Sequence, residues 1–180
     1  AGSGGVYAAT DSGVFRSTNS GDSWSKIGFA DKHVSEVFML GTGTLLAAVF
    51  YEGIYRSSNN GTNWAITSSG FNCSDIASVS ISGNNIFAGT AYNGLLRSSD
   101  NGNFWLKLSG GFKGTSCELV FTASENVLLA QSDSGLFRST NSGNNWQLVA
   151  GGIISFNNIV SNQSGTLFGC GSYPSFGVWK

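Results

Sequence analysis

The stretch GVFRSTNSGDSW, residues 13–24, decides the fold because it recurs along the chain at almost constant spacing. Near copies occupy residues 53–64, 94–105 and 135–146, and residues 177–180 match the start of a fifth copy. Successive copies begin 40, 41, 41 and 42 residues apart. A period of this size, with four short extended segments in each unit, is typical of the blades of a β-propeller.

The second part of each copy follows the pattern Ser-x-Asn/Asp-x-Gly-x-x-Trp, and we call this segment the box. Its defining residues are Ser17, Asn19, Gly21, Trp24, Ser57, Asn59, Gly61, Trp64, Ser98, Asp100, Gly102, Trp105, Ser139, Asn141, Gly143 and Trp146. The pattern resembles the Asp-box, or BNR repeat, of sialidases, sortilin-type receptors, family 74 xyloglucanases and propeller-type photosystem II assembly factors. The resemblance implies a blade and no single activity, since those proteins share little beyond the blade.

The chemistry of the box favours a structural role. An Asn or Asp side chain can accept hydrogen bonds from backbone N–H groups one or two residues further on, and the glycine supplies a positive φ. The tryptophan then buries its ring where the next strand begins. Only Asp100 keeps a carboxylate at the third position, so binding of Ca²⁺, which needs several carboxylates, is disfavoured. We assign no catalytic residue and no metal site to the boxes.

Composition excludes several function classes. A net charge of −1 with 11% charged residues leaves no basic patch, which argues against nucleic acid as a partner. No apolar run approaches the roughly 20 residues needed to cross a bilayer, so we expect no membrane insertion. The single histidine, His33, and the lack of a CxxC pair argue against zinc. Residues 41–43, Gly-Thr-Gly, form a hairpin turn with no helix after it, so no phosphate cradle and no cofactor are expected.

Three cysteines allow at most one intramolecular disulfide. Cys73 and Cys117 lie in successive loop regions and could approach one another. Cys170 stands between two glycines in a strand of small residues, which predicts a buried, small apolar side chain.

The repeat predicts an all-β protein, a β-propeller of four-stranded antiparallel blades with about five repeats. The repeat units are residues 1–29, 30–70, 71–111, 112–152 and 153–180, and together they form one domain, residues 1–180. The first unit lacks its inner strand and the last lacks its outer strand. We therefore expect a five-bladed or open arc, which self-association or flanking domains could complete.

Three residue types recur at fixed places in the repeat and have structural explanations. Small residues in the second strand allow close packing: Ala8, Ala47, Ala88, Ala130 and Gly169. Arginines in the third strand should pack their stems along the blade and bond backbone carbonyls: Arg16, Arg56, Arg97 and Arg138. Phenylalanines at the start of the inter-blade loops should plug each blade junction: Phe29, Phe71 and Phe112.

The turns between the second and third strands share one face with the inter-blade loops, which include His33, and this face carries the candidate binding site. Tyrosines in these turns are expected to be exposed beside polar side chains. Exposed rings can stack on the C–H faces of a sugar while polar groups fix its hydroxyls. The predicted ligand-binding residues are Tyr51, Glu52, Tyr92, Asn93, Asp133 and Tyr173.

These observations favour a noncatalytic binding propeller of a secreted protein, with a glycan or another protein as partner. A glycoside hydrolase of the xyloglucanase type, or a fragment of one, is the alternative, and it needs two carboxylates roughly 6.5–9.5 Å apart for inversion. By location, the candidates are Asp31, Glu52, Asp75 and Asp133. A sialidase needs a cluster of arginines to hold the carboxylate of its substrate. It is disfavoured because every arginine of this sequence occupies a repeat position. The remaining alternative is a structural repeat or assembly scaffold.

An extracellular or cell-surface location fits the low charge and three Asn-x-Ser/Thr sequons, which begin at Asn60, Asn72 and Asn162.

Overall fold

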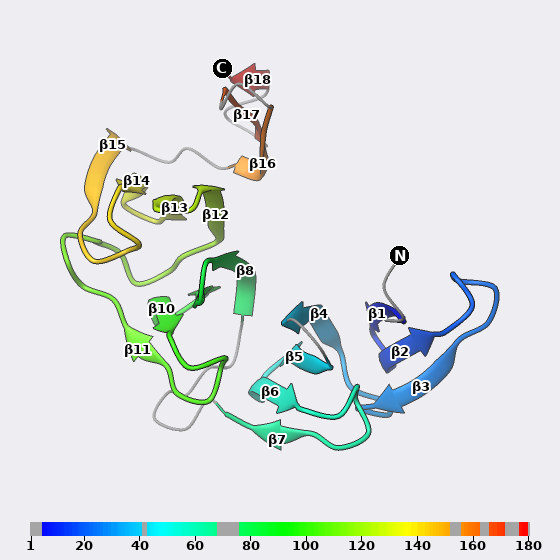
Figure 1. Cartoon of the computed structure of the whole chain (residues 1–180). Helices are drawn as coiled ribbons and strands as arrows, with labels where there is room; N and C mark the ends of the chain where they lie inside the picture. Colours follow the sequence, from blue (N-terminus) through cyan, green and yellow to red (C-terminus); the bar gives the residue numbers. More distant parts are fainter. Residues whose placement is uncertain are drawn as a thin grey trace. The chain divides into compact units, whose positions relative to one another are not determined.

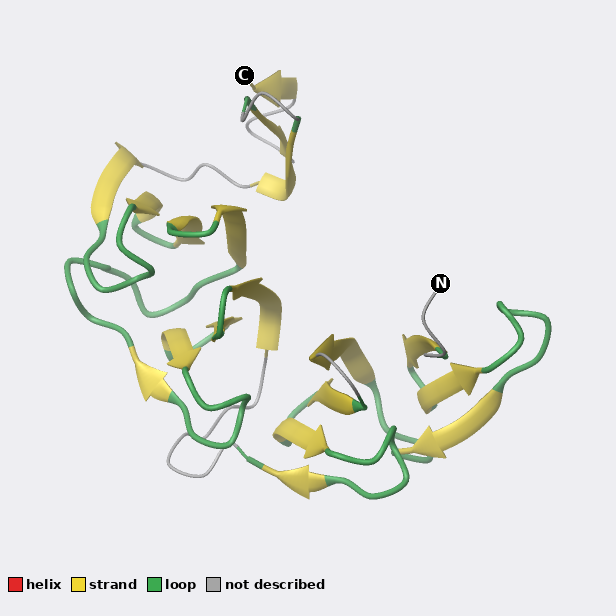
Figure 2. Ribbon diagram, in the orientation of Figure 1, coloured by secondary structure: helices red, strands yellow, loops and turns green. Residues whose placement is uncertain are grey.

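The computed structural model describes residues 5–40, 43–67, 76–151, 156–162, 166–171 and 177–179, and every regular element in them is a β-strand (Figure 2). The strands form five antiparallel sheets in which neighbours in sequence are neighbours in space (Figure 1). This arrangement confirms the predicted all-β fold built from a repeating sheet. No helix of a length and hydrophobicity suited to crossing a membrane occurs among these residues.

The first and last sheets have three described strands, and the three between them have four, as the repeat predicts. The first sheet contains β1 (Val6–Thr10), β2 (Gly13–Ser17) and β3 (Ser25–Gly28). The second contains β4 (Val34–Leu40), β5 (Thr44–Val49), β6 (Gly53–Ser57) and β7 (Ala65–Ile66). The third contains β8 (Ile76–Ser82), β9 (Asn85–Thr90), β10 (Gly94–Ser98) and β11 (Leu106–Lys107). The fourth contains β12 (Leu119–Ser124), β13 (Val127–Ser132), β14 (Gly135–Ser139) and β15 (Gln147–Gly151), and the fifth β16 (Phe156–Ser161), β17 (Leu167–Gly171) and β18 (Gly177–Trp179).

Contacts group the chain into two compact units. The first unit is Ala1–Ile76 with Asn101–Trp105, so it holds the first two sheets and part of the third box. The second unit is Ala77–Asp100 with Leu106–Lys180 and holds the other three sheets.

In the first unit, the core joins the first two sheets through Phe29. Its ring lies 4.9 Å from the ring of Tyr55 and 5.0 Å from that of Trp64, both in the second repeat. Val14 and Val34 are buried in the same cluster. Phe29 therefore plugs the junction between the two sheets, as the sequence predicts, and it adopts a left-handed φ of 57° to do so.

In the second unit, Phe112 plays the same part between the third and fourth sheets. Its ring lies 5.0 Å from Phe137 and 5.6 Å from Trp146, inside a cluster that also buries Phe87 and Leu95. The third phenylalanine of this series, Phe71, lies outside the described residues.

The inner strands of the third and fourth sheets are also joined by hydroxyl groups. Ser78 Oγ donates to the Val120 carbonyl at 3.3 Å and accepts from the Val120 N–H at 3.2 Å. Ser80 and Thr122 share a hydrogen bond of 2.7 Å between their hydroxyls. Because each hydroxyl satisfies a partner on the next sheet, these serines fix the relative position of β8 and β12.

Each box is held by its serine and by its Asn or Asp. In the second box, Ser57 Oγ accepts from the N–H of Gly61 at 2.9 Å and donates to Asn59 Oδ1 at 2.9 Å. Asn59 Oδ1 in turn accepts from the N–H of Asn63, four residues on, at 2.9 Å. The expectation that this side chain bonds an N–H one or two residues on was wrong, because the turn is wider and the serine bonds the nearer N–H groups. The glycine has a φ of 85°, as expected, and Asn60 before it is also left-handed at 57°.

The two described cysteines differ sharply in environment. Cys117 is a free, fully buried thiol, and burial raises its pKa to about 12. Cys170 is free and exposed, so the prediction that it is buried was wrong. Gly169 is the residue of β17 that faces inward, under the ring of Phe156, and strand alternation turns the next side chain outward. Cys73 lies outside the described residues, and the disulfide with Cys117 that the sequence allowed is not formed, because Cys117 is free.

Candidate functional site

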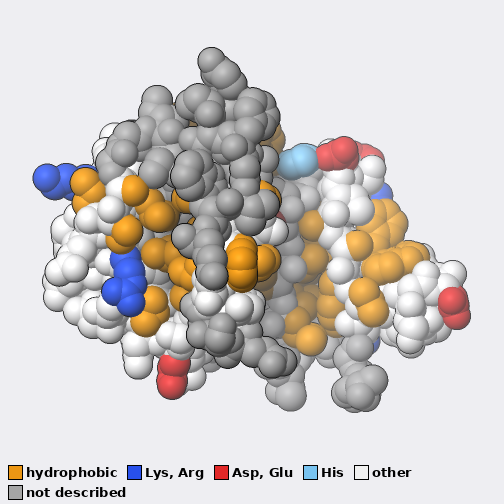
Figure 3. Space-filling model, turned by 90° about the horizontal axis from the view of Figure 1, so that it is seen from above, with side chains coloured by type: hydrophobic (Ala, Val, Ile, Leu, Met, Phe, Trp, Pro, Cys, Tyr) orange, Lys and Arg blue, Asp and Glu red, His pale blue; other side chains and the backbone are white. Residues whose placement is uncertain are grey.

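Exposed aromatic and charged side chains gather at three neighbouring connections of the first unit: the β1–β2 turn, the β3–β4 loop and the β5–β6 turn. We call this group the turn cluster. It consists of Asp11, Lys32, His33, Phe50, Tyr51, Glu52 and Tyr55. In Figure 3 the histidine lies at the surface beside acidic side chains.

The length of the β5–β6 turn explains why its aromatic rings are exposed. Val49 pairs with Gly53, so three residues, 50–52, make the connection. The Glu52 N–H closes the turn on the Val49 carbonyl at 3.0 Å. Tyr51, at the apex, has a φ of 60°. A left-handed conformation in a bulky residue costs on the order of 1–3 kcal/mol, so the surrounding hydrogen bonds must hold the turn in this shape. Its side chain remains 71% exposed.

Three rings follow one another across the cluster. The Phe50 and Tyr51 centroids are 4.1 Å apart with their planes at 50°, and the His33 and Phe50 centroids are 5.2 Å apart at 73°. The Phe50 N–H donates to the His33 carbonyl at 2.9 Å, which fastens the turn to the loop. Phe50 is 42% exposed. Two adjoining exposed aromatic side chains on a fastened turn form an apolar platform.

Charged groups border this platform. Lys32 Nζ lies 2.7 Å from Glu52 Oε1, and Tyr55 donates from its hydroxyl to Glu52 Oε2 at 2.9 Å. The hydrogen bond from Lys32, and to a smaller extent the one from Tyr55, holds the pKa of Glu52 below its ordinary value. The same pairing raises the pKa of Lys32, and burial raises the pKa of Tyr55. His33 Nδ1 contacts the carboxylate of Asp11.

Glu52 is therefore an ionised acceptor at neutral pH. A glycosidase acid needs the opposite, a carboxyl group whose pKa is raised so that it stays protonated. Among the other carboxylates considered for catalysis, Asp31 lies on an exposed turn with a φ of 61°, and Asp75 lies outside the described residues. Among the residues that the structure describes, Glu52 therefore does not fit the role of the protonated acid of a glycosidase. No group of three or more His, Cys, Asp or Glu suited to a metal ion occurs there either.

The second unit carries a simpler version of the turn. Thr90 pairs with Gly94, again leaving three residues in the connection, and Tyr92 at its middle is 70% exposed. The Asn93 N–H donates to Thr90 Oγ1 at 2.9 Å. Ala91 occupies the place that Phe50 has in the other turn, and no aromatic ring of the described residues packs against Tyr92. This turn offers a single ring rather than a platform.

Asp133, also predicted to bind ligand, does not extend either site. Asp133 accepts hydrogen bonds from the Thr115 hydroxyl at 2.9 Å and from the Thr115 N–H at 3.3 Å, so it fastens a loop of the second unit. Tyr173 lies outside the described residues. Tyr51 and Glu52 are thus the predicted residues that the structure brings together in the turn cluster.

Sequence reasoning missed Phe50, Lys32 and Asp11. Phe50 continues the apolar run of residues 45–49, so the sequence alone places it in the strand. The usable signal is the spacing to the next glycine: the β5–β6 turn has one residue more than the β1–β2 turn, which places Phe50 outside the strand.

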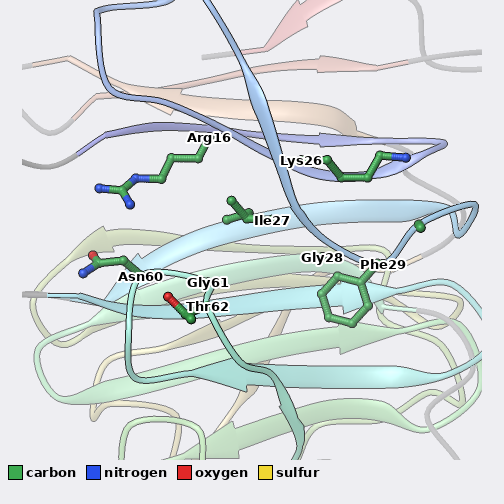
Figure 4. Close-up of a pocket in the computed structure, with 9 residues that line it drawn as sticks. Arg16, Lys26, Ile27, Gly28, Phe29, Asn60, Gly61 and Thr62 are labelled. Atoms are coloured by element: carbon green, nitrogen blue, oxygen red, sulfur yellow. The ribbon is translucent and has the colours of Figure 1, made fainter.

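A hollow of about 520 Å³ in the first unit lies where the second box meets the first sheet, and Figure 4 shows its lining. Arg16 and Lys26 both line it, but Arg16 lies near Asn60 whereas Lys26 points to the opposite side (Figure 4). Two cations that diverge do not focus on one anion. Phe29, its aromatic wall, is already occupied in the core. We therefore regard this hollow as the seam between a sheet and a box.

Neither protein-family models nor curated proteins give a match to the sequence. Solved structures do. An ancestral GH74 enzyme superposes with a TM-score of 0.72 at 24% identity, covering 92% of this chain and 25% of its own. The GH74 xyloglucanase from Xanthomonas campestris gives a TM-score of 0.69 at 16% identity, covering 92% and 32%. The extracellular domain of a hybrid two-component system from B. thetaiotaomicron gives 0.74 at 12% identity, covering 98% and 26%.

The fold is a β-propeller. These likenesses, together with the repeated four-stranded antiparallel sheets, establish that architecture and no activity, because all three identities are below 25%. The chain spans about a quarter to a third of the length of the structures it resembles.

Proposed function

We propose that this chain is a noncatalytic, carbohydrate-binding part of an extracellular β-propeller protein, and that the turn cluster is its sugar platform. The observation that carries the proposal is the pair of adjoining exposed rings, Phe50 and Tyr51, on a turn fastened beside the ionised Glu52. The GH74 xyloglucanase and the extracellular sensor domain among the similar structures support an extracellular and carbohydrate-related setting.

The chemistry of the cluster suits a neutral sugar. The C–H face of a pyranose stacks on an aromatic ring and removes apolar surface from water, while its hydroxyls need donors and acceptors beside the ring. Lys32 supplies donors and Glu52 supplies acceptors within one ion pair. A pair of opposite charges has no net attraction for a charged ligand, which favours a neutral glycan over a uronic acid.

The size of the effect can be estimated from the exposure of Tyr51. Burying a whole large apolar side chain contributes about 1.5–3 kcal/mol, and a stacked sugar covers about half of this one. Loss of the ring should therefore cost about 0.75–1.5 kcal/mol, which weakens the Kd roughly four- to thirteenfold.

A glycan array on the intact protein, with xyloglucan oligosaccharides among the probes and hydrolysis assayed on every hit, tests the proposal. Binding without turnover is the expected result. Turnover of a bound polysaccharide would refute the noncatalytic assignment, and the absence of any glycan ligand would refute the sugar platform.

A further inference from the structure

The second and third sheets each receive the box of the following repeat in the same way. In the third sheet, Arg97 Nη1 donates to the carbonyl of Ser142 in the fourth box at 3.2 Å. A Cβ added to Gly143 of that box would lie 2.6 Å from the Phe87 ring and 3.5 Å from Leu108. The glycine of the box thus presses directly on the sheet, and the arginine holds the carbonyl before it.

The second sheet receives the third box in the same manner. Arg56 Nε donates to the Asn101 carbonyl at 2.9 Å. A Cβ on Gly102 would lie 2.8 Å from Leu46. Asn101 and Ser142 hold the same place in their boxes, immediately before the glycine, and both have a left-handed φ, of 58° and 55°. Two junctions therefore share one receptor, an apolar residue of the second strand and an arginine of the third.

Strand register identifies the receptor in the fourth sheet. Leu46 pairs with Arg56 and Phe87 pairs with Arg97 across the second and third strands. The corresponding pair in the fourth sheet is Leu129 and Arg138. On the outer strand, Val149 corresponds to Leu108, since each lies three residues after its box tryptophan.

In the fourth sheet this receptor borders an apolar cavity of about 250 Å³. The cavity lies between the fourth and fifth sheets and is lined by Leu129, Leu136, Arg138, Val149, Phe156, Ile159, Leu167 and Gly169. Arg138 is the one charged group of the lining, and no hydrogen bond to it occurs within the described residues. Val149 is 56% exposed. Arg138 is exposed, so its guanidinium donors are available to a backbone carbonyl, the acceptor that Arg56 and Arg97 bind at their junctions.

We propose that this cavity is the docking site for a further box of the same type, one that directly follows a strand in the place of β18. Its glycine would contact Leu129 and Val149, and the carbonyl before that glycine would accept from Arg138. The backbone of β18 supports this occupant, because it pairs with β17 as the third strand pairs with the second in the other repeats. The inference is independent of the turn cluster, which belongs to the first unit.

The test extends the chain after Lys180 with a copy of residues 139–151, which supply the fourth box and its outer strand. The extended chain should melt on the order of 2–8 °C higher than the parent. The added tryptophan should also resist acrylamide quenching, as a buried ring does. A matched extension with valine in place of the glycine copied from Gly143 should gain nothing, because a side chain there has no room.

Arg138→Gln supplies the decisive control. It should change the melting temperature of the parent chain little, since Arg138 is exposed and unbonded there, and it should remove most of the gain in the extended chain. An equal gain from the valine extension, or a gain that Arg138→Gln leaves intact, would overturn the proposal. So would self-association of the parent chain that Leu129→Ala abolishes, because a second copy would then be the occupant.

Discussion

Replacing the box serine by alanine should have unequal effects in the first and second boxes, although the hydrogen bonds are nearly identical. Ser17 Oγ accepts from the Gly21 N–H at 2.8 Å, and Ser57 Oγ accepts from the Gly61 N–H at 2.9 Å. Both hydroxyls also donate to the Asn two residues on, and both serines are 1% exposed. The comparison stays within the first unit.

The difference lies in what covers the glycine. Gly61 is packed against Ile27, with an added Cβ only 2.3 Å from its Cδ1, whereas Gly21 has nothing nearer than its own Trp24 at 4.0 Å. Trp24 is itself 43% exposed. In Ser17→Ala, water can therefore reach the freed N–H, and the cost is one net hydrogen bond, about 1 kcal/mol. In Ser57→Ala, the N–H stays buried without a partner, and the free energy of unfolding should fall by about 2–3 kcal/mol.

Urea unfolding of the two variants, followed by far-UV circular dichroism, measures both changes against the parent protein. The slopes of the transitions should match, so that the midpoints report stability alone. Equal losses in the two variants, or a larger loss in Ser17→Ala, would refute the argument that the packing of Gly61 against Ile27 keeps water from its N–H.

Three further predictions concern other parts of the molecule. Phe112→Ala should lower the free energy of unfolding by about 3–5 kcal/mol, because it opens a cavity at a sheet junction. Calorimetric melting measures this loss, and a loss smaller than about 1 kcal/mol would contradict the packing of Phe112 at the junction. Because the pKa of Glu52 is lowered, its ion pair with Lys32 should contribute stability above the ordinary carboxyl pKa of 4.5, and this stability should be lost as the pH falls further. The difference in melting temperature between the parent and Glu52→Gln should therefore shrink below that pH. A difference that stays constant with pH would contradict the prediction. A maleimide should label Cys170 in the native protein and Cys117 only after unfolding, with peptide mass spectrometry locating the label; native labelling of Cys117 would contradict its burial.

The repeat in the sequence predicts the strands well, because one physical device recurs. A box glycine with positive φ and a serine at the end of the third strand define where each strand stops. The strand register then places Arg56 and Arg97 where their heads reach a backbone carbonyl, as the recurrence of arginine in the third strand predicts. What the sequence pattern does not contain is the partner, since that carbonyl belongs to the next repeat.

The candidate site was predictable only in part. The two turn tyrosines are exposed as expected, because a residue at the apex of a three-residue turn points away from the sheet. The pairing of Lys32 with Glu52 and the contact of His33 with Phe50 depend on how a loop and a turn meet in space. The tilted contact between the Phe50 and Tyr51 rings depends on the conformation of their turn. The exposure of Cys170 was missed for a similar reason, since it follows from which of two neighbouring residues faces the next sheet.

The most direct test of the central claim is isothermal titration calorimetry of the best glycan from the array against three proteins: the parent, Tyr51→Ala and Tyr92→Ala. The two tyrosines are matched in exposure and in turn length, but within the part of the chain that the structure describes a second ring adjoins Tyr51 and none adjoins Tyr92. The account predicts that Tyr51→Ala weakens binding roughly four- to thirteenfold and Tyr92→Ala leaves it unchanged. Undiminished binding by Tyr51→Ala, with the protein folded, would contradict it.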